Sequence, residues 1–243
     1  MMKHEAIEWS YEEVCSPGSE ALKSIKPPES HHLMGKTCIA WFKLADVLAR
    51  GEKERTLSIY RLLIHSINHE ALSAQLEGDI LRAFQDPNAV QSYVKAAALY
   101  QKQNELTLAA LLYETIIYLA PDVVDYRQTL FSLYQKIGYS DHALMVGRTL
   151  LEMLVARDMV FKAHELVRDA QLGGQAQGAL HEMFVINVLT SGKLIERSLL
   201  NTNIAAACDL YQDHAPDRLT AFLAKLAGLD EQAQEYAISC VKK

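Results

Sequence analysis

The sequence predicts an all-α fold, an α-solenoid of stacked antiparallel helical hairpins. The composition favours helix, because half of the 243 residues are hydrophobic while glycine (11) and proline (6) are scarce. A pattern also recurs with a period of 34 residues, the length of a helical-hairpin repeat. Its markers are Pro87 and Pro121, Tyr100-Gln101-Lys102 and Tyr134-Gln135-Lys136, and Ala109 and Ala143.

Two consecutive segments carry small and aromatic residues at regular positions. The first has Tyr93, Ala96, Ala97, Tyr100, Asn104, Ala109, Tyr113 and Pro121, and the second has Leu130, Phe131, Tyr134, Gly138, Ala143 and Leu150. This pattern resembles the tetratricopeptide repeat, although Ile116, Arg127 and Gly147 depart from it. The resemblance implies a right-handed superhelix of helix–turn–helix units. The alternative is a globular bundle that contains two ordinary helical hairpins.

The predicted organisation is an N-terminal tail, residues 1–33, followed by one helical-repeat domain, residues 34–243. The clearest repeats are 56–89, 90–123 and 124–157, and degenerate units are expected over 158–243. Ala109 and Ala143 fall where two helices should cross closely. Asn104 and Gly138 fall at turns where their residue types tolerate a left-handed backbone.

The tail has two interpretations. Trp9 and Tyr11 lie among acidic residues, and Pro27-Pro28 separates them from the first helix. Either the tail is a disordered leader, as termini often are, or it docks on a helical surface to bury its aromatic rings.

Charge and cysteine content limit the class of protein. The net charge of −6 argues against a surface for nucleic-acid phosphates or anionic lipid. Cys15, Cys38, Cys208 and Cys240 are scattered, which favours free thiols in a reducing compartment. The start of the chain lacks a secretory signal, and no apolar run is long enough to cross a bilayer. We therefore expect a cytoplasmic protein. The alternative is export by a pathway that needs no cleavable signal.

No recognisable catalytic, cofactor or metal motif accompanies the repeats. His65 and His69 could share a helix face, but zinc needs at least three protein ligands and no third can be placed. Serines lack a Gly-x-Ser-x-Gly context, and there is no phosphate-binding glycine loop. We expect a protein that is not an enzyme and that needs no cofactor or metal, although an enzyme with a dispersed site remains an alternative.

The resemblance implies a concave face that holds a peptide. The family uses positions 2, 5, 9 and 12 of the first helix of each repeat, and Lys95 lies beside them. Members that clamp a terminal carboxylate carry Asn and Lys or Arg there, and this chain lacks them. The alternatives are a subunit of an oligomeric complex, a chaperone for a secreted partner and, less favoured, an RNA-binding repeat; assembly of identical copies is compatible with each. The groove residues are Gln91, Val94, Ala98 and Gln101, then Asp125, Gln128, Ser132 and Gln135.

Overall fold

The computed structural model describes residues 31–193 and 195–241, and over these ranges it confirms the all-α class. They contain twelve α-helices, one short 3-10 helix and no strand. The predicted docking of the tail around Trp9 falls outside the described residues. The elements are α2 (His31–Ala49), α3 (Lys53–Leu63), η1 (Ile64–Ser66), α4 (Glu70–Ala83), α5 (Ala89–Lys102), α6 (Leu106–Leu119), α7 (Val124–Ile137), α8 (Ser140–Ala156), α9 (Val160–Asp169), α10 (Gly174–Ser191), α11 (Arg197–His214), α12 (Pro216–Ala227) and α13 (Glu231–Val241).

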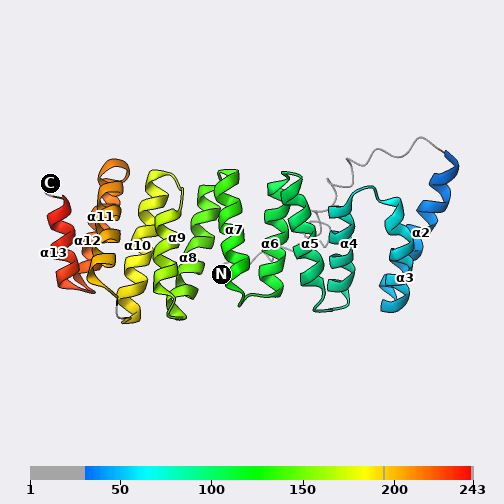
Figure 1. Cartoon of the computed structure of the whole chain (residues 1–243), viewed down its shortest axis with the longest axis horizontal. Helices are drawn as coiled ribbons and strands as arrows, with labels where there is room; N and C mark the ends of the chain where they lie inside the picture. The colour runs from blue at the N-terminus through cyan, green and yellow to red at the C-terminus, as the bar shows by residue number, and fades with distance from the viewer. Residues whose placement is uncertain (1–30, 194, 242–243) are drawn as a thin grey trace, which may run out of the picture. The chain divides into compact units, whose positions relative to one another are not determined.

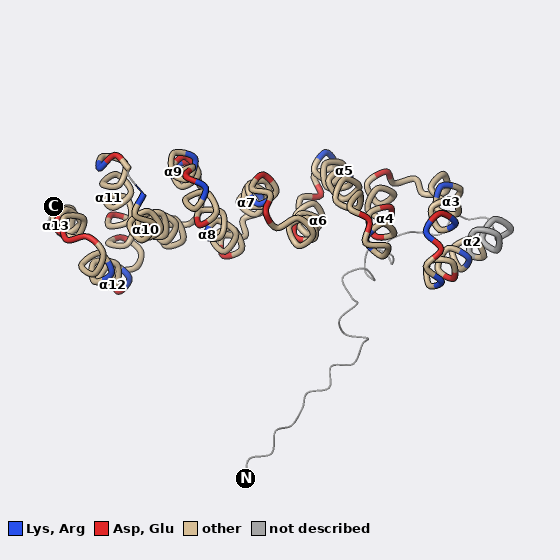
Figure 2. The backbone as a smooth tube through the Cα atoms, turned by 90° about the horizontal axis from the view of Figure 1, so that it is seen from below, with Lys and Arg blue, Asp and Glu red and all other residues tan. Residues whose placement is uncertain are grey.

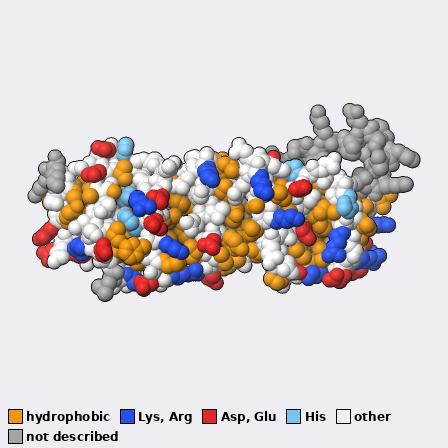
Figure 3. Space-filling view, in the orientation of Figure 1, with side chains coloured by type: hydrophobic (Ala, Val, Ile, Leu, Met, Phe, Trp, Pro, Cys, Tyr) orange, Lys and Arg blue, Asp and Glu red, His pale blue; other side chains and the backbone are white. Residues whose placement is uncertain are grey.

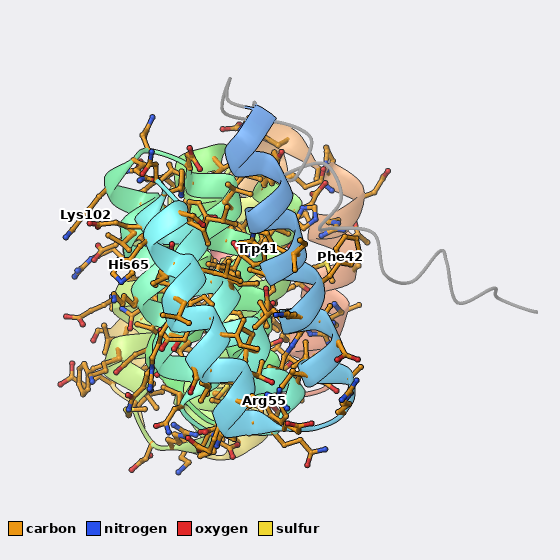
Figure 4. The ribbon with its side chains drawn as sticks, turned by 90° about the vertical axis from the view of Figure 1, so that its right-hand side faces the viewer. Trp41, Phe42, Arg55, His65 and Lys102 are labelled. Atoms are coloured by element: carbon orange, nitrogen blue, oxygen red, sulfur yellow. The ribbon has the colours of Figure 1, made fainter. Side chains whose placement is uncertain are left out.

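The chain divides into two compact units, Met1–Leu63 and Ile64–Lys243. The boundary lies inside the region 34–243 that the sequence predicts to be one domain, and inside the repeat 56–89. In the first unit, α2 packs on α3, and Gly51 turns the chain between them with a left-handed backbone (φ +76°). Figure 4 shows Trp41 on the side of α2 that faces α3 and Phe42 on the opposite side, where 77% of Phe42 is exposed.

The helices of the second unit stand side by side in chain order (Figure 1) and form two layers. Figure 2 shows α5, α7, α9 and α11 along one side, which we call the odd layer. It shows α4, α6, α8, α10 and α12 along the other side, which we call the even layer. Helices pack chiefly on their neighbours in sequence, and α8 also packs on α10.

The residues that carry the 34-residue period occupy the interior of this arrangement. Ala109 on α6 and Ala143 on α8 are fully buried, as the repeat register predicts. Asn104 (φ +61°) and Gly138 (φ +86°) take the expected left-handed backbone in the turns after α5 and α7. Other buried members of the pattern are Tyr93, Ala96, Ala97, Tyr100, Tyr113, Leu130, Phe131, Tyr134 and Leu150.

Tyrosine hydroxyls of the odd layer repeatedly donate to polar side chains of the preceding even helix. Tyr93 on α5 donates to Asp79 Oδ1 on α4 at 2.6 Å. Tyr134 on α7 donates to Glu114 on α6, and Tyr211 on α11 donates to Glu182 on α10. A hydrogen bond to a charged group is stronger than one between two neutral groups. Each of these bonds therefore fixes the register of two neighbouring helices.

A buried polar network joins α9, α10 and α11. The His181 Nδ1–H donates to Asn203 Oδ1, with 2.9 Å between N and O. Asn203 Nδ2 in turn donates to His164 Nδ1 at 2.9 Å and to the Leu199 carbonyl at 2.8 Å. Gln177 Nε2 donates to the Val167 carbonyl at 2.8 Å and lies 3.4 Å from His181 Nε2. In this arrangement both histidines are neutral, because each offers a lone pair to an amide N–H.

Candidate functional site

A groove of about 640 Å³ lies between α7 and α9 in the odd layer, and its volume is in the range of ligand-binding pockets. Buried Phe131 of α7 and Leu154 of α8 form its apolar floor, together with partly buried Leu166 of α9. Val123, the residue before α7, and Val124, its first residue, also line the groove. The groove therefore combines an apolar floor with two helical walls.

The α7 wall includes the four residues that the sequence assigns to the peptide face of the repeat 124–157. Asp125, Gln128, Ser132 and Gln135 all line the groove. Their spacing of three or four residues places them on one side of α7. Asp125 and Gln128 are exposed, whereas Ser132 and Gln135 are partly buried deeper in the groove.

The corresponding residues on α5 do not line this groove. Gln91, Lys95 and Ala98 are exposed on α5, and Val94 and Gln101 are partly buried there. Gln101 lies beside the hydroxyl of Tyr113 on α6. Burial raises the pKa of Tyr113, and hydrogen bonds from Thr129 and Gln101 oppose that rise. The structure therefore brings together the α7 half of the predicted peptide face, and the α5 half lies elsewhere on the odd layer.

Sequence reasoning missed the α9 wall, although the signal was present. Counting one further period of 34 residues from the four α7 positions gives Met159, Lys162, Leu166 and Asp169. All four line the groove. The sequence after residue 157 lacks the small and aromatic markers of the repeat, which hid this register. The positions that line the groove thus continue into α9 after the packing positions have lost the pattern.

The charges around the groove are only partly paired. The carboxylate of Asp169 pairs with Arg168 at 2.8 Å, and a hydrogen bond from Arg168 lowers the pKa of Asp169. Arg157 donates to the Asp122 carbonyl at 2.6 Å. Within the described ranges, no ion-pair partner lies within reach of Asp125, Lys162 or Glu165. These three side chains leave charges of both signs available to a bound segment.

One hydrogen-bond donor in the groove has no partner. The Nε2 of Gln135 is buried, and no acceptor of the described residues lies within hydrogen-bonding distance. A buried unpaired donor costs about 1–3 kcal/mol. The described lining provides hydrogen-bonding groups, unpaired charges and apolar contact, and it contains no histidine or cysteine.

The histidines and the cysteine that were considered for metal binding or catalysis cap a helix, lie exposed on the surface or are buried in the core. His69 precedes α4 and caps it, because its Nδ1 accepts a hydrogen bond from the Leu72 backbone N–H at 3.1 Å. His65 is exposed on η1. Cys208 is completely buried in α11, and burial raises the pKa of its thiol to about 12. A thiol with so high a pKa is a poor nucleophile, as the apolar sequence around it predicts.

Charge is mixed over the described part of the chain. Figure 2 shows acidic and basic residues interspersed along the helices, and Figure 3 shows no continuous basic band among the described residues of the face in view. None of the described helices has the length and hydropathy needed to cross a membrane.

No protein-family model matches the sequence, and comparison with curated proteins finds no similar relative. The tetratricopeptide resemblance accordingly rests on residue spacing in the sequence and stays a prediction.

Proposed function

We propose that this chain is a protein-interaction module that binds a peptide segment of a partner protein in the groove between α7 and α9. The same proposal includes a tetratricopeptide-like solenoid over the second unit, with the odd layer as its inner face. A cytoplasmic location stays a prediction from the sequence.

The observation that carries this proposal is the repetition of the groove positions. Asp125, Gln128, Ser132 and Gln135 on α7 have counterparts 34 residues later, one at the residue before α9 and three on α9, and all eight residues line one cavity. Facing first helices with matched registers form the peptide-binding surface of helical repeat proteins. Adding 34 to the residue numbers of the α7 wall gives residues of the opposite wall. An accidental gap between two helices would not show this regularity.

The chemistry of the groove favours a peptide over a small charged ligand. Its floor is apolar, its walls provide the amides of Gln128 and Gln135 and the hydroxyl of Ser132, and Gln135 Nε2 lacks an acceptor. A peptide backbone presents carbonyl groups at regular intervals, and its side chains can cover the floor. The charges are balanced rather than concentrated, so the groove lacks the cationic cluster that a carboxylate clamp requires.

Peptide-display selection against the intact chain tests this function. Selected peptides should bind the parent protein saturably. Gln128→Lys should weaken that binding about tenfold, because a longer charged side chain replaces an amide on the groove wall and neutralises Asp125 three residues before it. Gln103→Lys is the matched control, because Gln103 is also exposed but lies outside the groove. Equal binding by parent and Gln128→Lys, or equal loss in both variants, would contradict the proposed site.

A further inference from the structure

A second cavity, of about 400 Å³, lies between α8, α10 and α12 in the even layer. It is separate from the groove of the odd layer and shares none of its lining residues. Its apolar surface comes from Ala179, Met183 and Ile186 of α10 and from Ala221 of α12. Its polar surface comes from three cations, two carboxylates and one amide: Arg148, Arg218, Lys225, Glu152, Glu182 and Asn187.

A carboxylate on α10 organises the polar side of this cavity. The side chain of Glu182 is only 12% exposed, and its two oxygens are both engaged. Lys225 Nζ lies 2.5 Å from Oε1, and the Tyr211 hydroxyl donates to Oε2. The Glu182 charge is therefore fully balanced by Lys225 within the protein.

Arg218 adds a second cation beside the same network. Burial and the Glu182 hydrogen bond raise the pKa of Tyr211, whereas a hydrogen bond from Arg218 to the same hydroxyl opposes the rise. Across the described residues, no carboxylate lies within ion-pairing distance of Arg218. The remaining pair in the cavity, Arg148 and Glu152, is neutral overall, with 3.1 Å between Nε and Oε1. The cavity therefore carries one positive charge in excess.

An unpaired donor lines the same cavity. The Nδ2 of Asn187 is buried, and the described part of the chain places no acceptor within reach of it. This observation is independent of the charge count, and it also favours a ligand that accepts hydrogen bonds. An acceptor oxygen in the cavity would pair with both the exposed guanidinium of Arg218 and the buried N–H of Asn187.

We propose that this cavity binds a monocarboxylate with a compact apolar body. The carboxylate would accept hydrogen bonds from Arg218 and Asn187, and the apolar body would contact Met183 and Ile186. A single excess charge matches a monoanion, and a guanidinium presents parallel N–H groups that suit a carboxylate. The volume fits a small organic acid or the acidic side chain of a peptide.

Isothermal titration calorimetry with the intact chain tests this site, using sodium benzoate as the probe. Benzamide has the same size and no charge, so it should bind at least tenfold more weakly. Arg218→Gln should weaken benzoate binding about tenfold, because a hydrogen bond between charged groups is lost. Arg61→Gln, which removes the charge of an exposed arginine on α3, should leave benzoate affinity unchanged.

Two further arms separate the sources of the carboxylate. The peptide acetyl-Ala-Glu-Ala-amide tests a side-chain carboxylate; saturable binding that Arg218→Gln weakens supports the proposal, whether or not benzoate binds. Inorganic phosphate tests a general anion site, and affinity equal to that of benzoate would overturn the proposal. Absence of binding by both carboxylates, or equal losses in Arg218→Gln and Arg61→Gln, would overturn it as well. Circular dichroism of each variant confirms that the helices are intact.

Discussion

Gly147 shows how a single residue departs from the repeat pattern for a structural reason. The tetratricopeptide pattern expects an aromatic at this position of α8. A Cβ built on Gly147 would lie 2.8 Å from Phe131 Cε2 and 3.1 Å from Leu180 Cδ1. The Phe131 ring and Leu180 thus occupy the space that an aromatic would need.

We predict that Gly147→Ala destabilises the protein by about 1–2 kcal/mol, because overpacking against Phe131 outweighs the gain in helix propensity. Urea denaturation of the variant measures the change. Gly228→Ala is the matched control: Gly228 has φ −82°, and an added Cβ would meet only the Lys225 carbonyl oxygen at 3.6 Å. We expect the control to be neutral or slightly stabilising. An equally stable Gly147→Ala variant would refute the proposed close packing.

Gln135 provides a residue-scale test of the groove. Gln135→Met removes a buried donor that has no partner, so the free protein should become more stable by about 1 kcal/mol. The same change should weaken peptide binding several-fold, because a backbone carbonyl of the peptide loses its donor. Gln128→Met, on the same wall but exposed, should alter stability by less than about 0.5 kcal/mol. Loss of stability in Gln135→Met would show that its amide is satisfied in the free protein.

At the scale of helices, close packing depends on small residues at the crossings. Ala109 and Ala143 have no exposed surface. Replacing either with Leu should cost roughly 1–3 kcal/mol, because three extra carbon atoms have no space at a tight contact. Thermal melts of both variants measure this cost. Melting temperatures equal to that of the parent protein would contradict the repeat register.

The two histidines of the polar network between α9, α10 and α11 predict that the stability of the protein depends on pH. Burial lowers the pKa of His164 and of His181. For His164, the charge of Arg168 lowers the pKa further, whereas the charges of Glu165 and Asp169 raise it. For His181, the hydrogen bond with Asn203 raises the pKa, whereas the charge of His164 lowers it. The unfolded state therefore binds protons more readily than the folded state below about pH 6.5. Stability is fully present above that pH and is lost as the pH falls through it.

We predict that the urea midpoint falls between pH 7.5 and pH 5.5, and that His164→Gln combined with His181→Gln reduces this fall. His65→Gln is the control, because His65 is exposed and lies outside the network. The double variant is compared with the parent as a difference between the two pH values, so a uniform loss of stability does not affect the result. An unchanged fall in the double variant would assign the pH dependence to other groups.

At the scale of the whole molecule, the sequence predicts the helical class and the register from Tyr93 to Leu150. These follow from local signals: helix propensity, the 34-residue period, and turn residues such as Asn104 and Gly138. The α9 wall was not predicted, because α9 lacks the packing residues that mark a repeat. The division at Leu63 was not predicted either, since it depends on contacts between helices rather than on local pattern. The lack of an acceptor for the Gln135 amide depends on the positions of the neighbouring helices, so the sequence alone could not predict it.

The most direct test of the central claim locates a bound peptide on the intact chain. A photo-crosslinking amino acid is placed at Gln128 or Lys162, on the two groove walls, and at Gln103 or Thr115, which line neither cavity. A peptide obtained by selection against the parent protein is then added and irradiated. We predict crosslinks from positions 128 and 162 and none from 103 and 115. Crosslinks confined to 103 or 115 would contradict binding between α7 and α9.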